Sequence, residues 1–277
     1  MSMSSLSSNS PEDDFNLYLE KAVEASRAAG GILMNYLDRK IKIEFKGRID
    51  LVTEADKKAE DCILKILQEV FPDHGFLAEE SGNQKIDENR HMWVIDPLDG
   101  TTNYAHGYRC FSVSIALLVD GIRTVGVVYD PWGKELFTAI RDKGAFLNNK
   151  PISVSEEIDL EKSLLVTGFP YDIREGHVTN LGLFNHLILK AQAVRRDGSA
   201  ALDLAYVAAG RFDGLWELKL HPWDVAAGTL IVEEAGGKVT TFSGKQFEIT
   251  SLDLLATNGS IHLKLMQKIS EIPPESW

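Results

Sequence analysis

Apolar residues near the start of the chain recur at the spacing of amphipathic helices. Between residues 14 and 38 they lie three or four positions apart, which predicts one long helix packed on a core. A second helix is predicted from residue 53 to about residue 70. Its buried stripe would consist of Ala59, Ile63, Ile66, Leu67 and Val70. Residues 41–45 alternate between apolar and polar, which predicts a strand between the two helices.

The start of the second helix has a signature of its own. Thr53 and Asp56 fit the capping-box pattern, in which two side chains bond the free N–H groups of the first helical turn. This is a purely structural explanation for both residues. A helix N-terminus is also a site for anions, so a structural and a functional role are compatible here.

The middle of the chain consists of short apolar runs separated by turn residues. The predicted strands are residues 76–78, 92–95, 111–119, 122–129 and 134–140. The first ends at Glu79 and Glu80, and the second ends at Asp96. Asp120-Gly121 is a typical hairpin turn. The order predicts an antiparallel meander.

Helices and strands alternate after residue 160. The predicted strands are residues 163–167, 193–195, 212–218, 238–242 and 254–257, and the predicted helices are residues 177–190, 200–209, 225–235 and 261–269. This order predicts layers of sheets and helices, that is, an α/β (α+β) fold. We expect one domain over residues 13–277, with an N-terminal α+β half to about residue 150. The serine-rich residues 1–12 are predicted to be a disordered tail.

Charge and cysteine content narrow the class of protein. The formal net charge is -12, which argues against binding nucleic acid through its phosphates. An acidic protein that handles anionic substrates needs metal ions or a local basic cluster. Cys62 and Cys110 lie in apolar surroundings and are expected to be buried thiols, without a disulfide or a zinc site. Because there is neither a membrane-span pattern nor a signal-peptide pattern, we expect a cytoplasmic protein with no membrane partner.

Candidate chemistry is concentrated in residues 96–103, directly after a predicted strand. The proline after Asp96 favours extended backbone there, and Gly100 lets the backbone approach a ligand closely. The segment thus directs the carboxylates of Asp96 and Asp99 and the hydroxyl of Thr101 toward one point. Hard cations such as magnesium prefer oxygen ligands of this kind. The same composition is common in ordinary turns, so the segment alone leaves a structural role open.

Several segments together resemble the inositol monophosphatase family, and they occur in the family's order. They are residues 50–56 (DLVTEAD), 79–81 (EES), 96–103 (DPLDGTTN), 198–204 (GSAALDL), 223–228 (WDVAAG) and 234–237 (EAGG). The similarity covers roughly residues 15–270. One segment is weak evidence of a family, whereas their joint occurrence in this order is highly specific.

The resemblance implies a layered α-β-α-β-α sandwich and a magnesium-dependent phosphomonoesterase with roughly two or three metal ions per site. The implied metal ligands are Glu79, Asp96, Asp99, Asp224 and the backbone carbonyl of Leu98. Asp56 would help to hold a further, weaker metal through water. The four carboxylates would neutralise two divalent cations, so the site would stay near neutral until the substrate phosphate arrives.

These groups suit the hydrolysis of a phosphate monoester. Two metal ions about 3.5–4 Å apart can bind the attacking water and the ester oxygen, and coordination lowers the pKa of that water. Glu79 and Thr101 are the candidates for orienting the water. Thr53 would support Thr101 and Asp56 from outside the ligand set.

The substrate would be bound by a second set of residues. They are Asp99, Gly100, Thr101, Thr102, Gly198, Ser199, Ala200, Glu217 and Asp224. The backbone N–H groups of residues 100–102 would contact the phosphate, and Asp99, Ala200 and Glu217 would contact the hydroxyls of the alcohol. The alternative for Glu217 is an exposed acid on a strand. Lys46 matches a lysine of a mobile loop near the third metal.

The histidines of the chain are not expected to bind the metal ions. His106, His186 and His221 are expected to be structural, because hard magnesium sites rarely use imidazole.

Residues 104–110 depart from the family pattern, in which many relatives have a Phe-Pro pair near positions 108 and 109. That segment lies near the rim of the site, so the departure concerns substrate preference and leaves catalysis intact.

Inositol monophosphates such as inositol-1-phosphate are the leading substrates, and lithium sensitivity is expected. Histidinol phosphate, fructose-1,6-bisphosphate and 3′-phosphoadenosine 5′-phosphate are the alternatives. A nucleotide would need an apolar platform that the sequence does not identify, and a bisphosphate would need basic residues at the rim. The candidates for those are Arg109, Arg174, Arg195 and Arg196. A non-catalytic metal-binding regulator is the alternative of a different class, and a homodimer is expected from the family.

Overall fold

The computed structural model describes residues 11–37, 43–45, 51–81 and 90–277. The predicted tail lies outside the described residues as far as position 10. The first helix begins at Pro11, two residues before the domain boundary expected at residue 13, which stays a prediction. Lys46 and most of the predicted loop over residues 82–91 also lie outside the described residues.

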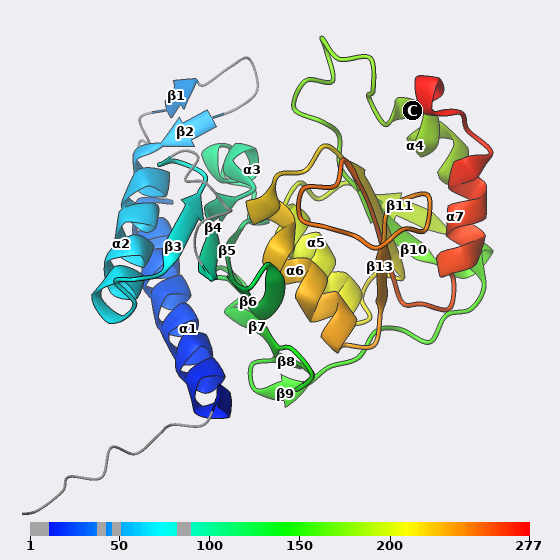
Figure 1. The fold of residues 1–277 in the computed structure, drawn as a ribbon. Helices are drawn as coiled ribbons and strands as arrows, with labels where there is room; N and C mark the ends of the chain where they lie inside the picture. The colour runs from blue at the N-terminus through cyan, green and yellow to red at the C-terminus, as the bar shows by residue number, and fades with distance from the viewer. Residues whose placement is uncertain (1–10, 38–42, 46–50, 82–89) are drawn as a thin grey trace, which may run out of the picture.

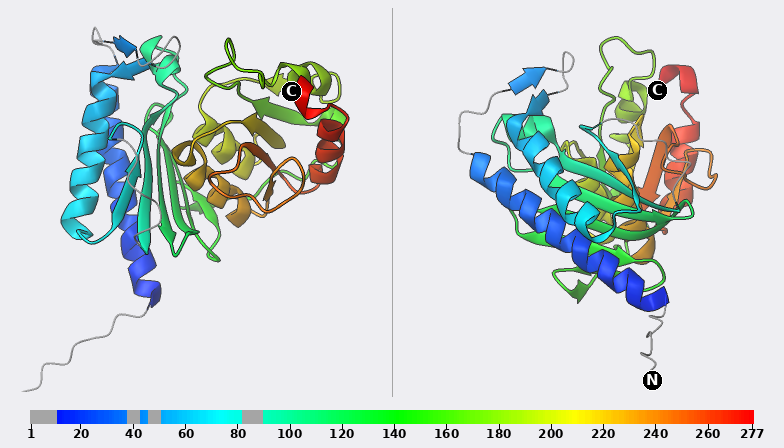
Figure 2. Two further views of the ribbon diagram at one scale, coloured as in Figure 1. Left: turned by 45° about the horizontal axis from the view of Figure 1, so that its top comes forward. Right: turned by 60° about the vertical axis from the view of Figure 1, so that its left-hand side comes forward.

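Six helices pack against two large sheets. They are α1 (Pro11–Tyr36), α2 (Glu54–Val70), α4 (Leu181–Leu187), α5 (Ala200–Ala208), α6 (Pro222–Glu234) and α7 (His262–Ser270). Helices α1 and α2 cover one face of the first sheet, α5 and α6 lie between the sheets, and α4 and α7 cover the outer face of the second sheet (Figures 1 and 2). The predicted α-β-α-β-α layering is therefore confirmed.

The first sheet has seven strands in sequence order. They are β3 (Gly75–Ala78), β4 (His91–Asp99), β5 (Ser112–Val119), β6 (Ile122–Asp130), β7 (Glu135–Ile140), β8 (Ala145–Leu147) and β9 (Lys150–Pro151). Only the β3–β4 pair is parallel, so the predicted antiparallel meander from β4 onward is confirmed. Asp120 and Gly121 both have positive φ, which is the geometry of the favoured two-residue hairpin turn.

The second sheet has five strands. Their spatial order is β11 (Ala193–Arg195), β10 (Leu164–Thr167), β12 (Gly214–Leu218), β14 (Asp253–Thr257) and β13 (Lys238–Thr240). The first three strands are mutually parallel, and β14 is antiparallel to both of its neighbours.

Five short elements of the described chain lie outside these layers. They are the strand pair β1 (Ile43–Phe45) and β2 (Leu51–Thr53), the helix α3 (Thr101–Ala105), and 3₁₀ turns over Leu160–Lys162 and Pro274–Ser276. None of the helices in the described part of the chain is long and apolar enough to span a membrane.

The burial of α6 explains its composition. Every residue from Asp224 to Val232 is buried, because one face of the helix packs on the seven-stranded sheet and the other faces the five-stranded sheet. A helix that is apolar all round is expected in such a central layer. Helices α1 and α2 instead bury one stripe each, against Trp93 and the other apolar residues of the first sheet's outer face.

Several predicted boundaries differ from the structure. The strand predicted to stop before Asp96 continues to Asp99, with a bulge between these two residues. The helix predicted over residues 177–190 is limited to Leu181–Leu187 and begins after Asn180, whose φ is positive. Helix α6 begins at Pro222, which makes Asp224 its third residue and His221 its N-cap.

Candidate active site

The bulge at the end of β4 turns Asp96 and its neighbours inward. One oxygen of the Asp96 carboxylate accepts a hydrogen bond from the N–H of Leu98 at 2.9 Å. The carbonyl of Leu98 in turn accepts from the hydroxyl of Thr101 at 3.0 Å. A bulge commonly redirects side chains in this way at functional sites. The predicted ligands Asp96 and Leu98 are thus held next to Thr101, as the sequence motif suggested.

Asp99 is held by the start of α5, which is about one hundred residues away in sequence. Its carboxylate accepts hydrogen bonds from the N–H groups of Ala200 at 3.2 Å and Ala201 at 2.9 Å, and from the hydroxyl of Ser199. The hydroxyl of Ser112 on β5 lies 3.4 Å from the same carboxylate. The positive end of the α5 dipole therefore faces a carboxylate, which is a favourable arrangement.

Asp224 reaches the site from the N-terminus of α6. Its carboxylate accepts a hydrogen bond from the N–H of His221 at 2.7 Å, which completes a capping box. The other end of α6 is tied to the edge of the first sheet. There Glu233 pairs with Arg123 at 2.9 Å, and Glu234 accepts from the N–H groups of Asp142 and Gly144.

These three elements bring Asp96, Asp99 and Asp224 together. One carboxylate oxygen from each lies within 4.8 Å of the other two, and all three side chains are buried. Burial raises the pKa of all three carboxyls. The neighbouring carboxylates raise the pKa values of Asp96 and Asp224 further, because like charges oppose ionisation. Three crowded, oxygen-only donors of this kind fit a hard divalent cation, whose charge would offset theirs.

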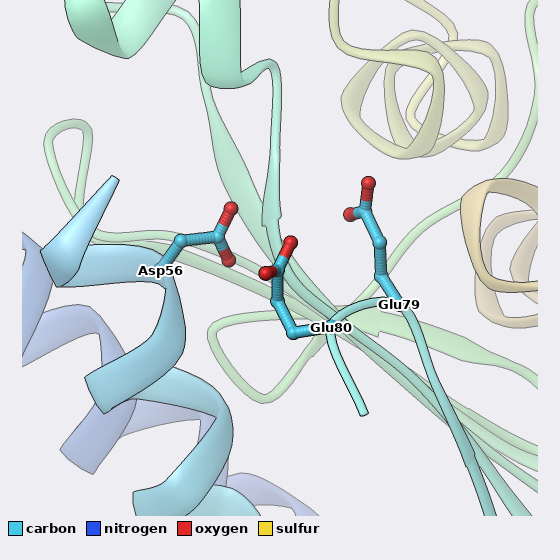
Figure 3. A group of neighbouring side chains, drawn as sticks. All are labelled: Asp56, Glu79 and Glu80. Carbon is cyan, nitrogen blue, oxygen red and sulfur yellow. The ribbon is translucent and has the colours of Figure 1, made fainter. Parts of the chain in front are cut away.

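A second acidic group lies at the end of β3 and the start of α2. Asp56, Glu79 and Glu80 each place one carboxylate oxygen within 4.8 Å of the others. Figure 3 shows the carboxylates of Asp56 and Glu80 facing each other, with Glu79 beside them. Asp56 is buried, whereas the two glutamates are half-buried. The N–H of Glu80 donates to the buried carboxylate of Glu60 on α2 at 2.8 Å, which fixes the end of β3 against that helix.

The loop after β11 is hydrogen-bonded to α3. The side-chain amide of Asn103 donates to the carbonyls of Cys110 at 2.7 Å and of Asp197 at 2.8 Å. Gly100 has φ +93°, and a Cβ on it would lie 2.9 Å from the carbonyl of Cys110. The same Cβ would lie 3.2 Å from the carbonyl of Gly198, so a larger residue at position 100 would push this turn away from both segments.

A cavity of about 150 Å³ is lined by Asp99 and Asp224 of the buried acidic group. Its lining includes the predicted substrate residues Asp99, Gly100, Thr101, Thr102, Gly198, Ser199, Ala200, Glu217 and Asp224. One wall is apolar and comes from Phe169, Pro170, Tyr171 and Ile173. The cavity is thus polar at the metal-binding end and mixed along its sides, as is usual for small-molecule sites.

Glu217 is a buried residue and not the exposed strand acid considered as its alternative. It is 7% exposed on β12, and burial raises its pKa to about 8. A Cβ on Gly168 would collide with its carboxylate, so a larger residue at position 168 would displace the carboxylate of Glu217. Of the four arginines considered for the rim, only Arg196 lines the cavity. The guanidinium of Arg109 instead stacks on the ring of Trp132, with 3.6 Å to the ring centroid.

Other predictions have mixed outcomes. The side chain of Thr53 lies outside the described residues, so its supporting role stays a prediction. The rings of His221 and Trp223 stack at 4.8 Å, in agreement with a structural role for this histidine. The Nε2 atom of His186 lies 3.0 Å from the carboxylate of Glu271, in agreement with the structural role predicted for His186. Cys62 and Cys110 are unpaired and half-buried.

Sequence reasoning missed three residues of the site. Glu80 was noted at the end of a strand but was not expected among the ligands. Asp203 was read only as part of a motif, and Tyr171 was not singled out. The doubled acid at positions 79 and 80 is the one signal that pointed to any of them.

Comparison with known proteins places this site in a family. The model of the inositol monophosphatase family matches residues 16–273. The inositol-1-monophosphatase of Synechocystis sp. is 49% identical over 94% of this chain and 91% of its own length. The Nus factor SuhB of Pasteurella multocida is 43% identical over 92% of this chain and 96% of its own. The solved inositol monophosphatase of Anabaena has 49% identity and a TM-score of 0.87, over 95% of this chain and 100% of that one.

The layered fold, the two oxygen-only acidic groups and the family match together define a metal-dependent phosphoric monoester hydrolase. The chain belongs to the inositol monophosphatase family.

Proposed function

We propose that this protein is a magnesium-dependent phosphatase that hydrolyses inositol monophosphates, such as inositol-1-phosphate, to inositol and phosphate. The observation that carries the proposal is the buried group of Asp96, Asp99 and Asp224. Asp99 and Asp224 line a cavity that Glu217 also lines. The acids would bind the cations that receive the phosphate, and the rest of the cavity would bind the alcohol. The 49% identity to a protein named inositol-1-monophosphatase supports this substrate.

Both acidic groups fit magnesium, because every donor is an oxygen. In the proposal, the ligands are Glu79, Asp96, Asp99, Asp224 and the carbonyl of Leu98, and Asp56 helps to hold a further ion. Bound magnesium would neutralise the phosphate and activate water for attack. The half-buried second group, to which Glu80 contributes, would bind its ion more weakly.

The protein's own groups position the reactants. The hydroxyl of Thr101 is fixed by the carbonyl of Leu98 and can orient the attacking water together with Glu79. Residues 100–102 line the cavity and would present backbone N–H groups to the phosphate. Asp99 is held rigidly by α5, so it needs no rearrangement when substrate binds.

The residues that line the cavity distinguish among the alternative substrates. A bisphosphate would need several basic side chains at the rim, and only one of the four candidate arginines lines the cavity. The apolar wall at residues 169–173 keeps a nucleotide within the alternatives, together with histidinol phosphate. A non-catalytic regulator is disfavoured because the chain has all four expected carboxylates. Lithium inhibition, a homodimer and a cytoplasmic location are proposed from the family resemblance.

A substrate panel tests the proposal. Phosphate release would be measured with millimolar magnesium and with a chelator, on inositol-1-phosphate, histidinol phosphate, fructose-1,6-bisphosphate and 3′-phosphoadenosine 5′-phosphate. We expect the highest kcat/KM for inositol-1-phosphate and no turnover in the chelator. Absence of release from every monoester would reject the enzyme, and a higher kcat/KM for another substrate would reject the assignment to inositol phosphates.

A further inference from the structure

One wall of the cavity comes from the loop between β10 and α4, which lies at the top of the view in Figure 1. Its apolar side chains are those of Phe169, Pro170, Tyr171 and Ile173. Tyr171 is 55% exposed although it lines the cavity. A side chain that is more than half exposed gains little from burial, so specific contacts are needed to hold this part of the wall in place.

Two contacts tie the loop to the segment between β12 and α6. The carboxylate of Asp172 accepts a hydrogen bond from the Nζ atom of Lys219 at 2.8 Å. The ring of Tyr171 stacks on that of His221, with the centroids 6.4 Å apart. Lys219 itself lines the cavity, and the N–H of His221 donates to the carboxylate of Asp224. The wall is thus joined to the segment that also positions one of the buried acids.

Lys219 has a backbone conformation that is unusual for a lysine. Its φ is +57°, in the left-handed region that favours glycine. Seven non-glycine residues of the described chain have positive φ, and five of them are Asp or Asn, which tolerate this region. Of the two lysines, Lys134 lies in the turn between β6 and β7, whereas Lys219 follows a buried strand at the cavity. Glycine would adopt this backbone more easily, so the side chain of Lys219 requires an explanation.

Stability of the fold does not explain the ion pair between Lys219 and Asp172. The two side chains are 33% and 50% exposed, so water and salt screen their attraction. Exposed ion pairs of this kind contribute little to the free energy of unfolding. The pair does fix the residue next to Tyr171, and its effect is therefore expected on the shape of the cavity.

We propose that Lys219 and Asp172 are positioning residues, whose ion pair holds the apolar wall of residues 169–173 against the leaving alcohol. The inference rests on the proposed phosphatase function. The wall contacts the part of the substrate that does not react, so it stabilises the bound substrate and the transition state equally. Interactions of this type lower KM and leave kcat unchanged.

Steady-state kinetics of variants of the pair test the proposal. The substrate is inositol-1-phosphate, or the monoester with the highest kcat/KM if another is preferred. In Lys219→Met and Asp172→Asn we expect KM to rise about 3- to 10-fold, with kcat changed less than roughly twofold. Lys219→Arg keeps the charge and should retain a KM near that of the wild type. Lys268→Met breaks an exposed ion pair with Glu271 that lies outside the cavity lining, and it is the matched control.

The direction of the change in Asp172→Asn separates positioning from direct binding of the substrate by Lys219. If Lys219 bound the substrate itself, removal of its partner would free the ammonium group and lower KM. Opposite changes in KM for Lys219→Met and Asp172→Asn would therefore overturn the proposal. The double variant should have the KM of either single variant, because both remove the same interaction, and additive losses would also overturn the proposal.

A glycine at position 219 separates this role from a structural one. Lys219→Gly removes the ion pair but suits the left-handed backbone, so KM should rise as in Lys219→Met while Tm stays unchanged or rises. A lower Tm together with a lower kcat would overturn the proposal. Unchanged KM in folded Lys219→Gly would do the same.

Failure of the proposed function gives a different result. If the wild-type protein with magnesium hydrolyses no monoester, the phosphatase assignment fails, and hydrogen–deuterium exchange then decides whether the ion pair positions the wall. Faster exchange of the amides in residues 169–176 of Lys219→Met and Asp172→Asn than of the wild type and Lys268→Met would support the inference. Equal exchange in all of these proteins would overturn it.

Discussion

The two acidic groups of this protein differ in how firmly the protein holds their carboxylates. Asp96, Asp99 and Asp224 are all buried, and each accepts hydrogen bonds from backbone N–H groups of β4, α5 or α6. In the other group, Glu79 and Glu80 are half-buried at the end of a strand. Ligands that are fixed before a cation arrives lose little freedom on binding, whereas half-buried side chains at the end of a strand lose more. The comparison predicts one tight and one weak cation position.

The largest effect is expected from Asp96, which lies in the buried group. Asp96→Asn should lower kcat/KM by about a thousandfold, because it removes one charge from the ligands that position the cations. The fold should persist, since the amide is isosteric and removes a carboxyl that crowds its neighbours. Steady-state kinetics and thermal unfolding measure the two effects. Near-normal activity would refute the ligand assignment.

A smaller effect is expected from Thr101, whose hydroxyl lies beside the Leu98 carbonyl. Thr101→Ala should lower kcat about 10- to 100-fold and change KM much less, because the hydroxyl acts on the attacking water. Thr101→Ser keeps the hydroxyl and is the matched control. An effect confined to KM would reject the role of the Thr101 hydroxyl in orienting the attacking water.

A variant of Glu80 tests the weaker cation position, because Glu80 belongs to the half-buried acidic group. Glu80→Gln should raise the magnesium concentration for half-maximal activity by roughly tenfold or less, with little change in kcat at saturation. Magnesium should still raise Tm in this variant, because the buried group remains intact. If Glu80→Gln abolished turnover at saturating magnesium, the two groups would be equally essential, and the comparison would fail.

A buried histidine outside both acidic groups shows how burial changes the pKa of a side chain that is not expected to bind a cation. His262 on α7 contacts the hydroxyls of Thr240 and Thr257, each at 2.9 Å, and burial lowers its pKa to about 4. The unfolded chain therefore binds a proton more readily than the folded one between about pH 6.5 and 4. The stability that this histidine contributes is complete above about pH 6.5 and is lost as the pH falls toward 4.

Chemical denaturation at several pH values measures this contribution. His262→Gln should lose less free energy of unfolding between pH 6.5 and 4 than the wild type does. His177→Gln changes an exposed histidine and should follow the wild-type profile. Identical profiles for His262→Gln and the wild type would contradict the assignment.

The sequence predicted most of the layered fold, because long amphipathic helices and short apolar strands have clear periodicities. It failed where geometry depends on distant partners. The strand through Asp96 continues as a bulge because β5 pairs with it beyond the proline, and no local pattern indicates this. The motifs identified Asp96, Asp99 and Asp224 through resemblance. Asp203 could not be recognised, because its burial in the lining of the cavity is seen only in the folded protein.

The anchoring of α6 constrains the length of the chain itself. Asp224 lies at one end of this helix, and Glu233, nine positions later, is held by Arg123 at the edge of the sheet. Deleting one residue between them would turn Asp224 by about 100° relative to that anchor and move it by roughly 1.5 Å. Cation binding would weaken as a result, although the helix would remain apolar. The chain can therefore change the identity of many residues in α6 more easily than it can change their number.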